Sequence, residues 1–169
     1  IAWSDLGALW GITFSPYRGI FYQSPVLLAI FPGFYLWWRR KNSRSELCLS
    51  ILIIAGFLLF NAGYAYWDGV GSVGARFLIP ALPFLCLGLL ESGRRRYGTV
   101  FSLGIISVMI MLVVTATEPR VEWNVKSPIF YFNFFLFFRG LISDNLGTLA
   151  KLPGLLSIIP LALIMLIFS

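Results

Sequence analysis

The chain has 169 residues, of which 59% are hydrophobic, 17% aromatic and only 12% charged, and its net charge is +6. Soluble domains carry about 25% charged residues, so this composition argues against a soluble all-α core protein and indicates a helical membrane protein. The positive charge does not indicate nucleic-acid binding, because most lysines and arginines lie in two short segments beside apolar stretches.

Histidine is absent from the sequence, which excludes imidazole bases, histidine metal sites and haem ligation. The two cysteines, Cys48 and Cys86, both lie in apolar segments. We interpret them as packing residues rather than as a disulfide or a metal pair. We therefore expect no cofactor and no metal, although a divalent cation is compatible with the scattered carboxylates.

Residues 1–20 are predicted to form a loop or interfacial segment, anchored by Trp3 and Trp10. Five apolar stretches follow that we expect to enter the membrane: 21–38, 47–67, 77–90, 99–117 and 152–168. The first has a predicted kink at Pro32 and Gly33. The aromatic run 129–138 is too short to span and is predicted to be an interfacial or re-entrant helix.

The predicted fold is therefore all-α, a polytopic transmembrane bundle of about five spans plus one short interfacial helix. It forms a single membrane-embedded region over residues 1–169. The chain begins at Ile1 without a methionine or a signal-peptide pattern and ends inside an apolar run. We therefore expect it to be the C-terminal part of a longer protein.

The distribution of basic residues predicts the orientation. Segments 39–46 and 91–98 hold seven of the thirteen lysines and arginines, so both are expected on the cytoplasmic side of an inner or plasma membrane. Alternation of the spans then places segments 1–20, 68–76 and 118–151 on the outer face.

The first candidate motif covers residues 14–25. Arg18 offers a planar fork of donors that suits a phosphate, and Ser15, Tyr22 and Ser24 add hydroxyl groups. The alternative is an interfacial arginine that snorkels to lipid headgroups beside aromatic anchors.

The second candidate motif covers residues 67–77, between two apolar segments. Its glycine-spaced N–H groups, together with Ser72 and Arg76, predict an oxyanion pocket at the start of a helix. Alternatively, Asp68 and Arg76 pair with each other and merely close a tight loop. The spacing matches neither a Walker loop nor a Rossmann fingerprint.

Five carboxylates are expected on the outer face, and each is a candidate general base or metal ligand. They are Asp5, Asp68, Glu118, Glu122 and Asp144. Their spacing selects none of them, so the catalytic residue stays unassigned.

The two motifs together resemble a known family. The patterns are Phe-Ser-Pro-x-Arg-Gly-x-Phe-x-x-Ser-Pro-Val-Leu-Leu at 14–28 and Trp-x-Gly-x-x-Ser-x-Gly-x-Arg-Phe-Leu-x-Pro-Ala-Leu-Pro at 67–83. They look like the C-terminal half of bacterial polytopic glycosyltransferases of the C-type superfamily. These are similar to the dolichyl-phosphate-mannose–protein mannosyltransferases and the lipid A aminoarabinose transferases. The chain departs from the usual pattern at Val70 and Ala75.

The resemblance implies an inverting hexosyl or pentosyl transferase of the cell envelope that takes a sugar from a polyprenyl-phosphate donor on the outer face. Arg18 and Arg76 match the positions that neutralise the donor phosphate, with Asp68, Ser72, Ser15 and Tyr22 as further candidate substrate contacts. The family's catalytic acid usually lies in a first outer loop near the N-terminus, so it is not carried over to this chain. The expected partners are the lipid-linked donor, membrane lipids and an acceptor that the sequence does not identify.

Two non-enzymatic alternatives remain at this point, a transporter or flippase of lipid-linked substrates and a membrane assembly subunit. A translocation path should place polar residues within the spans. The segments 21–38, 47–67 and 99–117 carry only Gln23, Asn61 and scattered serines. This pattern weighs against transport.

Overall fold

The computed structural model describes residues 6–40, 43–69, 71–122, 124–160 and 163. These residues are mostly helical and contain no β-strand, only an isolated antiparallel bridge between Ser72 and Arg120. The all-α prediction is confirmed. Trp3, Asp5, Val70 and most of the segment 161–168 lie outside the described residues.

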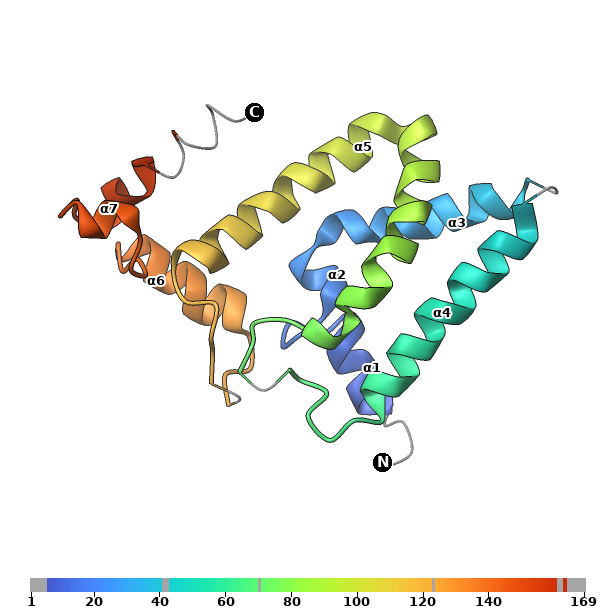
Figure 1. Ribbon diagram of the computed structural model, residues 1–169, viewed down its shortest axis with the longest axis horizontal. Coiled ribbons are helices and arrows are strands. Elements are labelled where there is room, and N and C mark those ends of the chain that lie inside the picture. Colours follow the sequence, from blue (N-terminus) through green and yellow to red (C-terminus); the bar gives the residue numbers. More distant parts are fainter. Residues whose placement is uncertain (1–5, 41–42, 70, 123, 161–162, 164–169) are drawn as a thin grey trace.

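The N-terminal half of the structure consists of short helices followed by one long helix (Figure 1). They are α1 (Leu6–Thr13), α2 (Ile20–Gln23), the 3₁₀ helix η1 (Pro25–Ala29), α3 (Ile30–Trp38) and α4 (Arg44–Ala62). The predicted segment 21–38 is thus interrupted at Ser24, where φ is −129° and ψ is 78°. Pro25 explains this break, because a residue before proline avoids the helical region. Pro32, the predicted kink, lies in the first turn of α3, where a missing N–H is tolerated.

The C-terminal half is dominated by α5. Its elements are η3 (Arg76–Ala81), α5 (Leu82–Ala116), the π-helix η4 (Ile129–Asn133), α6 (Phe134–Phe138), α7 (Leu146–Leu149) and η5 (Gly154–Ile158). The expected short aromatic helix corresponds to η4 and α6, which together span Ile129–Phe138. Of the predicted segment 152–168, the structure describes η5 and a few neighbouring residues.

Two of the predicted spans are joined in α5 without a loop. The segment 91–98, expected as a connection, is helical except for Arg96, whose φ of −131° and ψ of 44° break the helix. Figure 1 shows α5 changing direction sharply along its length. The segment contains no proline, and glutamate and arginine favour helix, so one non-helical residue suffices to turn the chain.

Two helical stretches are long and apolar enough to cross a membrane by length and composition. They are Arg44–Ala62, with 19 residues, and Arg76–Ala116, with 41 residues. The apolar helices Pro25–Trp38 and Ile129–Phe138 are shorter. At about 1.5 Å per residue, α4 is about 28 Å long, close to the thickness of a bilayer's hydrocarbon core.

The helices pack through small residues. A Cβ atom on Gly33 in α3 would overlap the carbonyl of Gly88 in α5, so the two backbones are in direct contact there. A separate cluster of Ala8, Ile12 and Ala62 holds α1 against the end of α4. The loop after α4 therefore lies at the same end of the molecule as α1 (Figure 1).

Candidate functional site

The loop 69–76 is a tight turn held by its own glycines. Gly69 and Gly71 have φ values of 83° and 79°, a region that side chains disfavour. The Ser72 hydroxyl lies 2.6 Å from the Gly74 carbonyl and 3.2 Å from the Gly69 carbonyl. Loop closure therefore accounts for these glycines without an anion.

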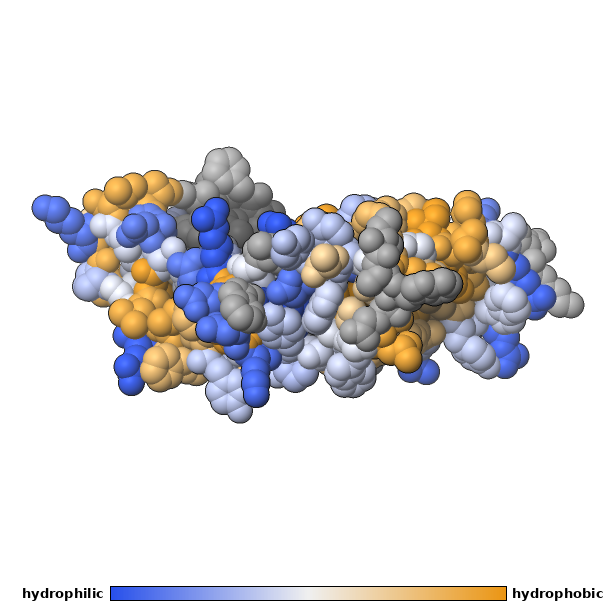
Figure 2. Space-filling model, turned by 90° about the horizontal axis from the view of Figure 1, so that it is seen from below, coloured by the Kyte–Doolittle hydropathy of each residue, from blue (hydrophilic) through white to orange (hydrophobic). Residues whose placement is uncertain are grey.

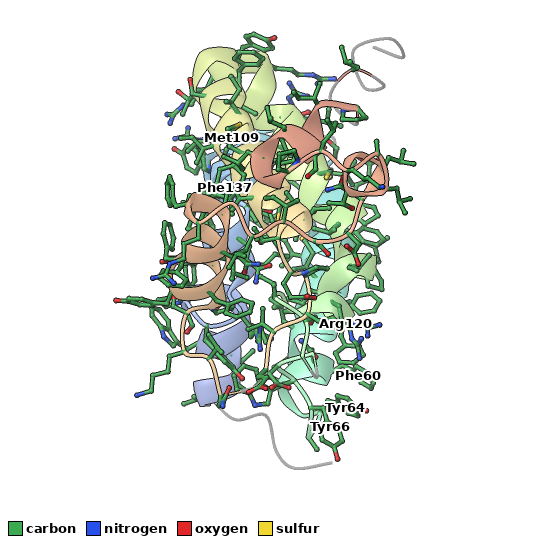
Figure 3. All side chains as sticks on the ribbon, turned by 90° about the vertical axis from the view of Figure 1, so that its left-hand side faces the viewer. Phe60, Tyr64, Tyr66, Met109, Arg120 and Phe137 are labelled. Atoms are coloured by element: carbon green, nitrogen blue, oxygen red, sulfur yellow. The ribbon has the colours of Figure 1, made fainter. Side chains whose placement is uncertain are left out.

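The same loop is attached to the connection that follows α5. The N–H of Val121 donates to the Gly71 carbonyl over 2.8 Å, beside the bridge between Ser72 and Arg120. Figure 3 shows Arg120 at the same end of the molecule as Tyr64 and Tyr66, which follow α4. Segments from three distant parts of the chain therefore meet at this end.

Arg18 is buried beneath these segments, with 0% of its surface exposed. Its guanidinium carbon lies 4.6 Å from the ring centre of Tyr17, and Nη2 makes a long contact of 3.5 Å to the Glu122 carbonyl. Among the described residues, Nε and Nη1 find no hydrogen-bond acceptor. A buried guanidinium with so few partners among the described residues is costly, so Arg18 is an unusual polar group in this part of the structure.

Tyr17 connects Arg18 to the second motif. Its hydroxyl donates to Oδ2 of Asp68 over 3.2 Å. Burial raises the pKa of Tyr17 above its ordinary value of 10.0, the Asp68 carboxylate raises it further, and Arg18 opposes both effects. The hydroxyl is therefore protonated and able to donate at neutral pH.

A cavity of about 320 Å³ opens beside this network, between α2, η3 and the end of α5. Apolar side chains form most of its wall, among them Leu27, Ile79, Leu82 and Val114. Its polar groups are Gln23, Ser24, Ser72, Arg76 and Thr115. Arg76 is exposed and is the one cation among the described lining residues. Gln23 Nε2 donates to the Val73 carbonyl over 2.6 Å and so ties α2 to the loop.

The six predicted site residues separate into two groups. Arg76 and Ser72 line the cavity, whereas the other four do not. Arg18 and Asp68 belong to the neighbouring Tyr17 network, and Ser15 accepts a hydrogen bond from the Tyr17 N–H over 3.1 Å. Tyr22 packs edge-on against Phe130, with ring centres 5.7 Å apart.

Each charged residue of the loop has a recorded contact with an aromatic side chain. Arg76 lies over the neighbouring Phe77 ring, 5.2 Å from its centre, and Asp68 accepts a hydrogen bond from the Tyr17 hydroxyl. The sequence did not single out Thr115 or Pro119 as lining residues. Gln23 was visible as a lone polar residue in an apolar stretch, a signal of function in membrane segments.

The face that carries these segments is mixed in character. Figure 2 views it from below and shows hydrophilic residues gathered toward its middle and left, with hydrophobic residues on either side. Within the described ranges, no three carboxylates or cysteines come together in a way that could hold a metal ion. The cavity can thus offer one positive charge, a few hydroxyl and amide groups, and an apolar wall.

Comparison with models of protein families, with curated proteins and with solved structures finds no match for this chain. The likeness of segments 14–28 and 67–83 to a family therefore remains an expectation. What the site can do follows from its own groups. These suit an elongated ligand with a negatively charged head and an apolar body.

Proposed function

We propose that the chain belongs to an integral membrane glycosyltransferase that moves a sugar from a polyprenyl-phosphate donor to an acceptor on the outer face. The observation that carries this proposal is the cavity, where one exposed guanidinium, Arg76, stands at an apolar wall. A lipid-linked sugar likewise combines a charged group with an apolar part, because its phosphate joins an apolar chain to a polar sugar. Gln23, Ser24 and Thr115 supply groups that can bond sugar hydroxyls.

The proposed membrane arrangement has about five spans. It uses 21–38, α4, the two arms of α5 on either side of Arg96, and the C-terminal apolar segment. Segments 39–46 and 91–98 face the cytoplasm, and 68–76 and 118–151 face outward. Supporting this, Glu91 bonds Arg40 in the first basic segment, while Ser72 bridges to Arg120 at the other end of α4. At about 28 Å, α4 is long enough to hold these two ends apart by the thickness of a bilayer's hydrocarbon core.

In the proposed reaction, an acceptor hydroxyl attacks the anomeric carbon and the bond from that carbon to the phosphate oxygen breaks. The electron pair of this bond leaves with the polyprenyl phosphate, and the configuration inverts. Arg76 stabilises the charge that develops on the leaving phosphate, which lowers the barrier. Arg18 lies outside the cavity lining, so in this scheme it holds the outer connection at Glu122. The group that takes the acceptor proton is unassigned.

One observation favours a second candidate, a protein that binds or moves lipid-linked sugars without reacting them. The described residues that line the cavity include no carboxylate, so none of them can act as the general base. Binding at Arg76 would then occur without turnover. No observation of this kind favours a membrane assembly subunit.

The test is transfer from a polyprenyl-phosphate sugar by the full-length protein in lipid nanodiscs. We expect Arg76→Ala to lower the rate by about 10²–10³-fold, the effect of removing one donor to a developing charge. Arg139→Ala is the matched control, because this exposed arginine packs on Phe135, outside the cavity. Unchanged transfer by Arg76→Ala would remove the site assignment. Binding of the donor by wild-type protein without any transfer would favour the second candidate.

A further inference from the structure

The end of the molecule opposite the cavity carries a cluster of arginines from two segments. Glu91 Oε1 accepts hydrogen bonds from Nη1 of Arg40 over 2.9 Å and from Nη1 of Arg94 over 3.0 Å. The Glu91 side chain is 13% exposed, whereas those of Arg40 and Arg94 are 49% and 63% exposed. One shielded carboxylate thus draws together two arginines that remain open to an outside ligand.

Aromatic side chains order the other arginines of the first segment. The guanidinium of Arg39 lies 5.1 Å from the ring centre of Tyr35 and bonds its hydroxyl. Arg44 lies 5.1 Å from the ring centre of Trp38 and donates to the Trp38 carbonyl over 3.1 Å. Tyrosine and tryptophan prefer the depth of lipid headgroups, so these contacts hold the charges at that level.

The break in α5 supplies the remaining charges. Arg94, Arg95 and Arg96 are all exposed and lie at the non-helical residue where α5 turns. We call the full set the arginine corner: Arg39, Arg40, Arg44, Arg94, Arg95 and Arg96. The same two segments contain only two carboxylates, Glu46 and Glu91, so the corner has a large surplus of positive charge.

We propose that the arginine corner is a binding site for the phosphate headgroup of an anionic phospholipid in the leaflet that it faces. Each arginine presents five N–H donors, and Glu91 uses one each from Arg40 and Arg94, so most donors stay available for phosphate oxygens. The apolar helices on both sides of the corner supply a surface for the acyl chains of a lipid. A soluble polyanion has no need of such a surface, so this feature favours a lipid as the ligand. This inference rests on the membrane placement proposed above and not on transferase activity.

The experiment measures lipid binding by the full chain in neutral detergent, using native mass spectrometry with phosphatidylglycerol, phosphatidylcholine or inorganic phosphate. Attraction to an anionic surface is about 1 kcal/mol for each basic residue. The double variant Arg94→Gln/Arg95→Gln should therefore bind phosphatidylglycerol about 30-fold more weakly. The control Arg139→Gln/Lys151→Gln makes the same change of charge outside the corner and should keep wild-type affinity within about twofold.

Three results would overturn the proposal: equal weakening by the control, equal binding of phosphatidylcholine, or saturation by inorganic phosphate that displaces the lipid. Should the double variant fail to fold, Arg95→Gln alone replaces it, since Arg95 makes no ion pair within the described part of the chain. Glu91→Gln should instead strengthen the binding of phosphatidylglycerol, because it frees two arginines and removes a negative charge. Sugar transfer plays no part in these readouts, so an inactive transferase leaves the test intact.

Discussion

The hydroxyl of Tyr17 lies 3.2 Å from Oδ2 of Asp68 and joins two segments that are 51 positions apart in the sequence. On one side Tyr17 stacks with the buried Arg18, and on the other side Asp68 begins the loop that leads to Arg76. The contact therefore fixes the loop that carries Ser72 and Arg76, which is part of the cavity wall, relative to the segment that carries Arg18. It also explains why an acid stands at the start of the glycine-rich loop.

Replacing Tyr17 by phenylalanine should lower the free energy of unfolding by about 1 kcal/mol, the usual net value of one hydrogen bond. The ring and its contact with Trp67, with centres 5.9 Å apart, would remain. Chemical unfolding in detergent micelles measures the change. Tyr131→Phe is the control, because Tyr131 is 82% exposed and its hydroxyl should contribute nothing measurable.

The raised pKa of Tyr17 predicts a pH dependence at the alkaline end. Above pH 10 the unfolded chain loses this proton while the folded chain keeps it, so the folded state binds more protons. Stability should therefore fall as the pH rises from about 10 through the folded pKa. The decline between pH 9 and pH 11 should be smaller in Tyr17→Phe than in the wild type. An identical decline in both proteins would contradict this assignment.

Gly69→Ala should disrupt the loop. The backbone at this residue has a φ of 83°, and an added Cβ would overlap the Ser72 hydroxyl and come within 2.9 Å of the Gly74 carbonyl. We expect a loss of about 1–3 kcal/mol of stability, together with loss of ligand binding in the cavity. Gly104→Ala, in a helix with nothing within 4 Å of its Cβ position, should be neutral or slightly stabilising. Thermal unfolding of the two variants side by side gives the comparison.

The crossing of α3 and α5 should be as sensitive to an added methyl group as the loop at Gly69 is. A methyl group on Gly33 would meet the Gly88 backbone, which cannot move aside as a side chain can. Gly33→Ala should therefore push the helices apart and destabilise the fold by about 1–3 kcal/mol. Gly56→Ala in α4 has open space and serves as the control. Similar melting temperatures for both variants would show that the close approach is not needed for folding.

Much of the helical pattern could be predicted from the sequence, because apolar length and basic ends are local signals. The helix predicted over 47–67 corresponds to α4, Arg44–Ala62, which ends five residues earlier than predicted and is capped by Gly63. The errors lie where one residue decides the outcome. Ser24 breaks a predicted span because proline follows it, and the expected loop 91–98 is helical except at Arg96.

The candidate site was predictable only in part. The position of Arg76 beside Ser72 follows from a short segment, and both residues line the cavity. The burial of Arg18 depends on the connection near Glu122, which lies 104 positions away in the sequence. A local pattern carries no information about such packing. For the same reason no signal in the sequence indicated that Thr115, at the far end of α5, and Pro119, just after α5, line the cavity.

The connection after α5 depends on Asn133, which is fully buried in η4. Its Nδ2 donates to Thr117 Oγ1 over 2.9 Å and to the Glu118 carbonyl over 2.7 Å, next to Pro119 in the cavity wall. Asn133→Ala would leave that carbonyl without its donor, so we expect a loss of about 1–3 kcal/mol in unfolding free energy. It should also increase hydrogen exchange at Val121, whose N–H bonds the Gly71 carbonyl. Asn124 is exposed, so Asn124→Ala should change neither the unfolding free energy nor the hydrogen exchange at Val121. Faster exchange at Val121 in both variants would contradict a specific role for Asn133.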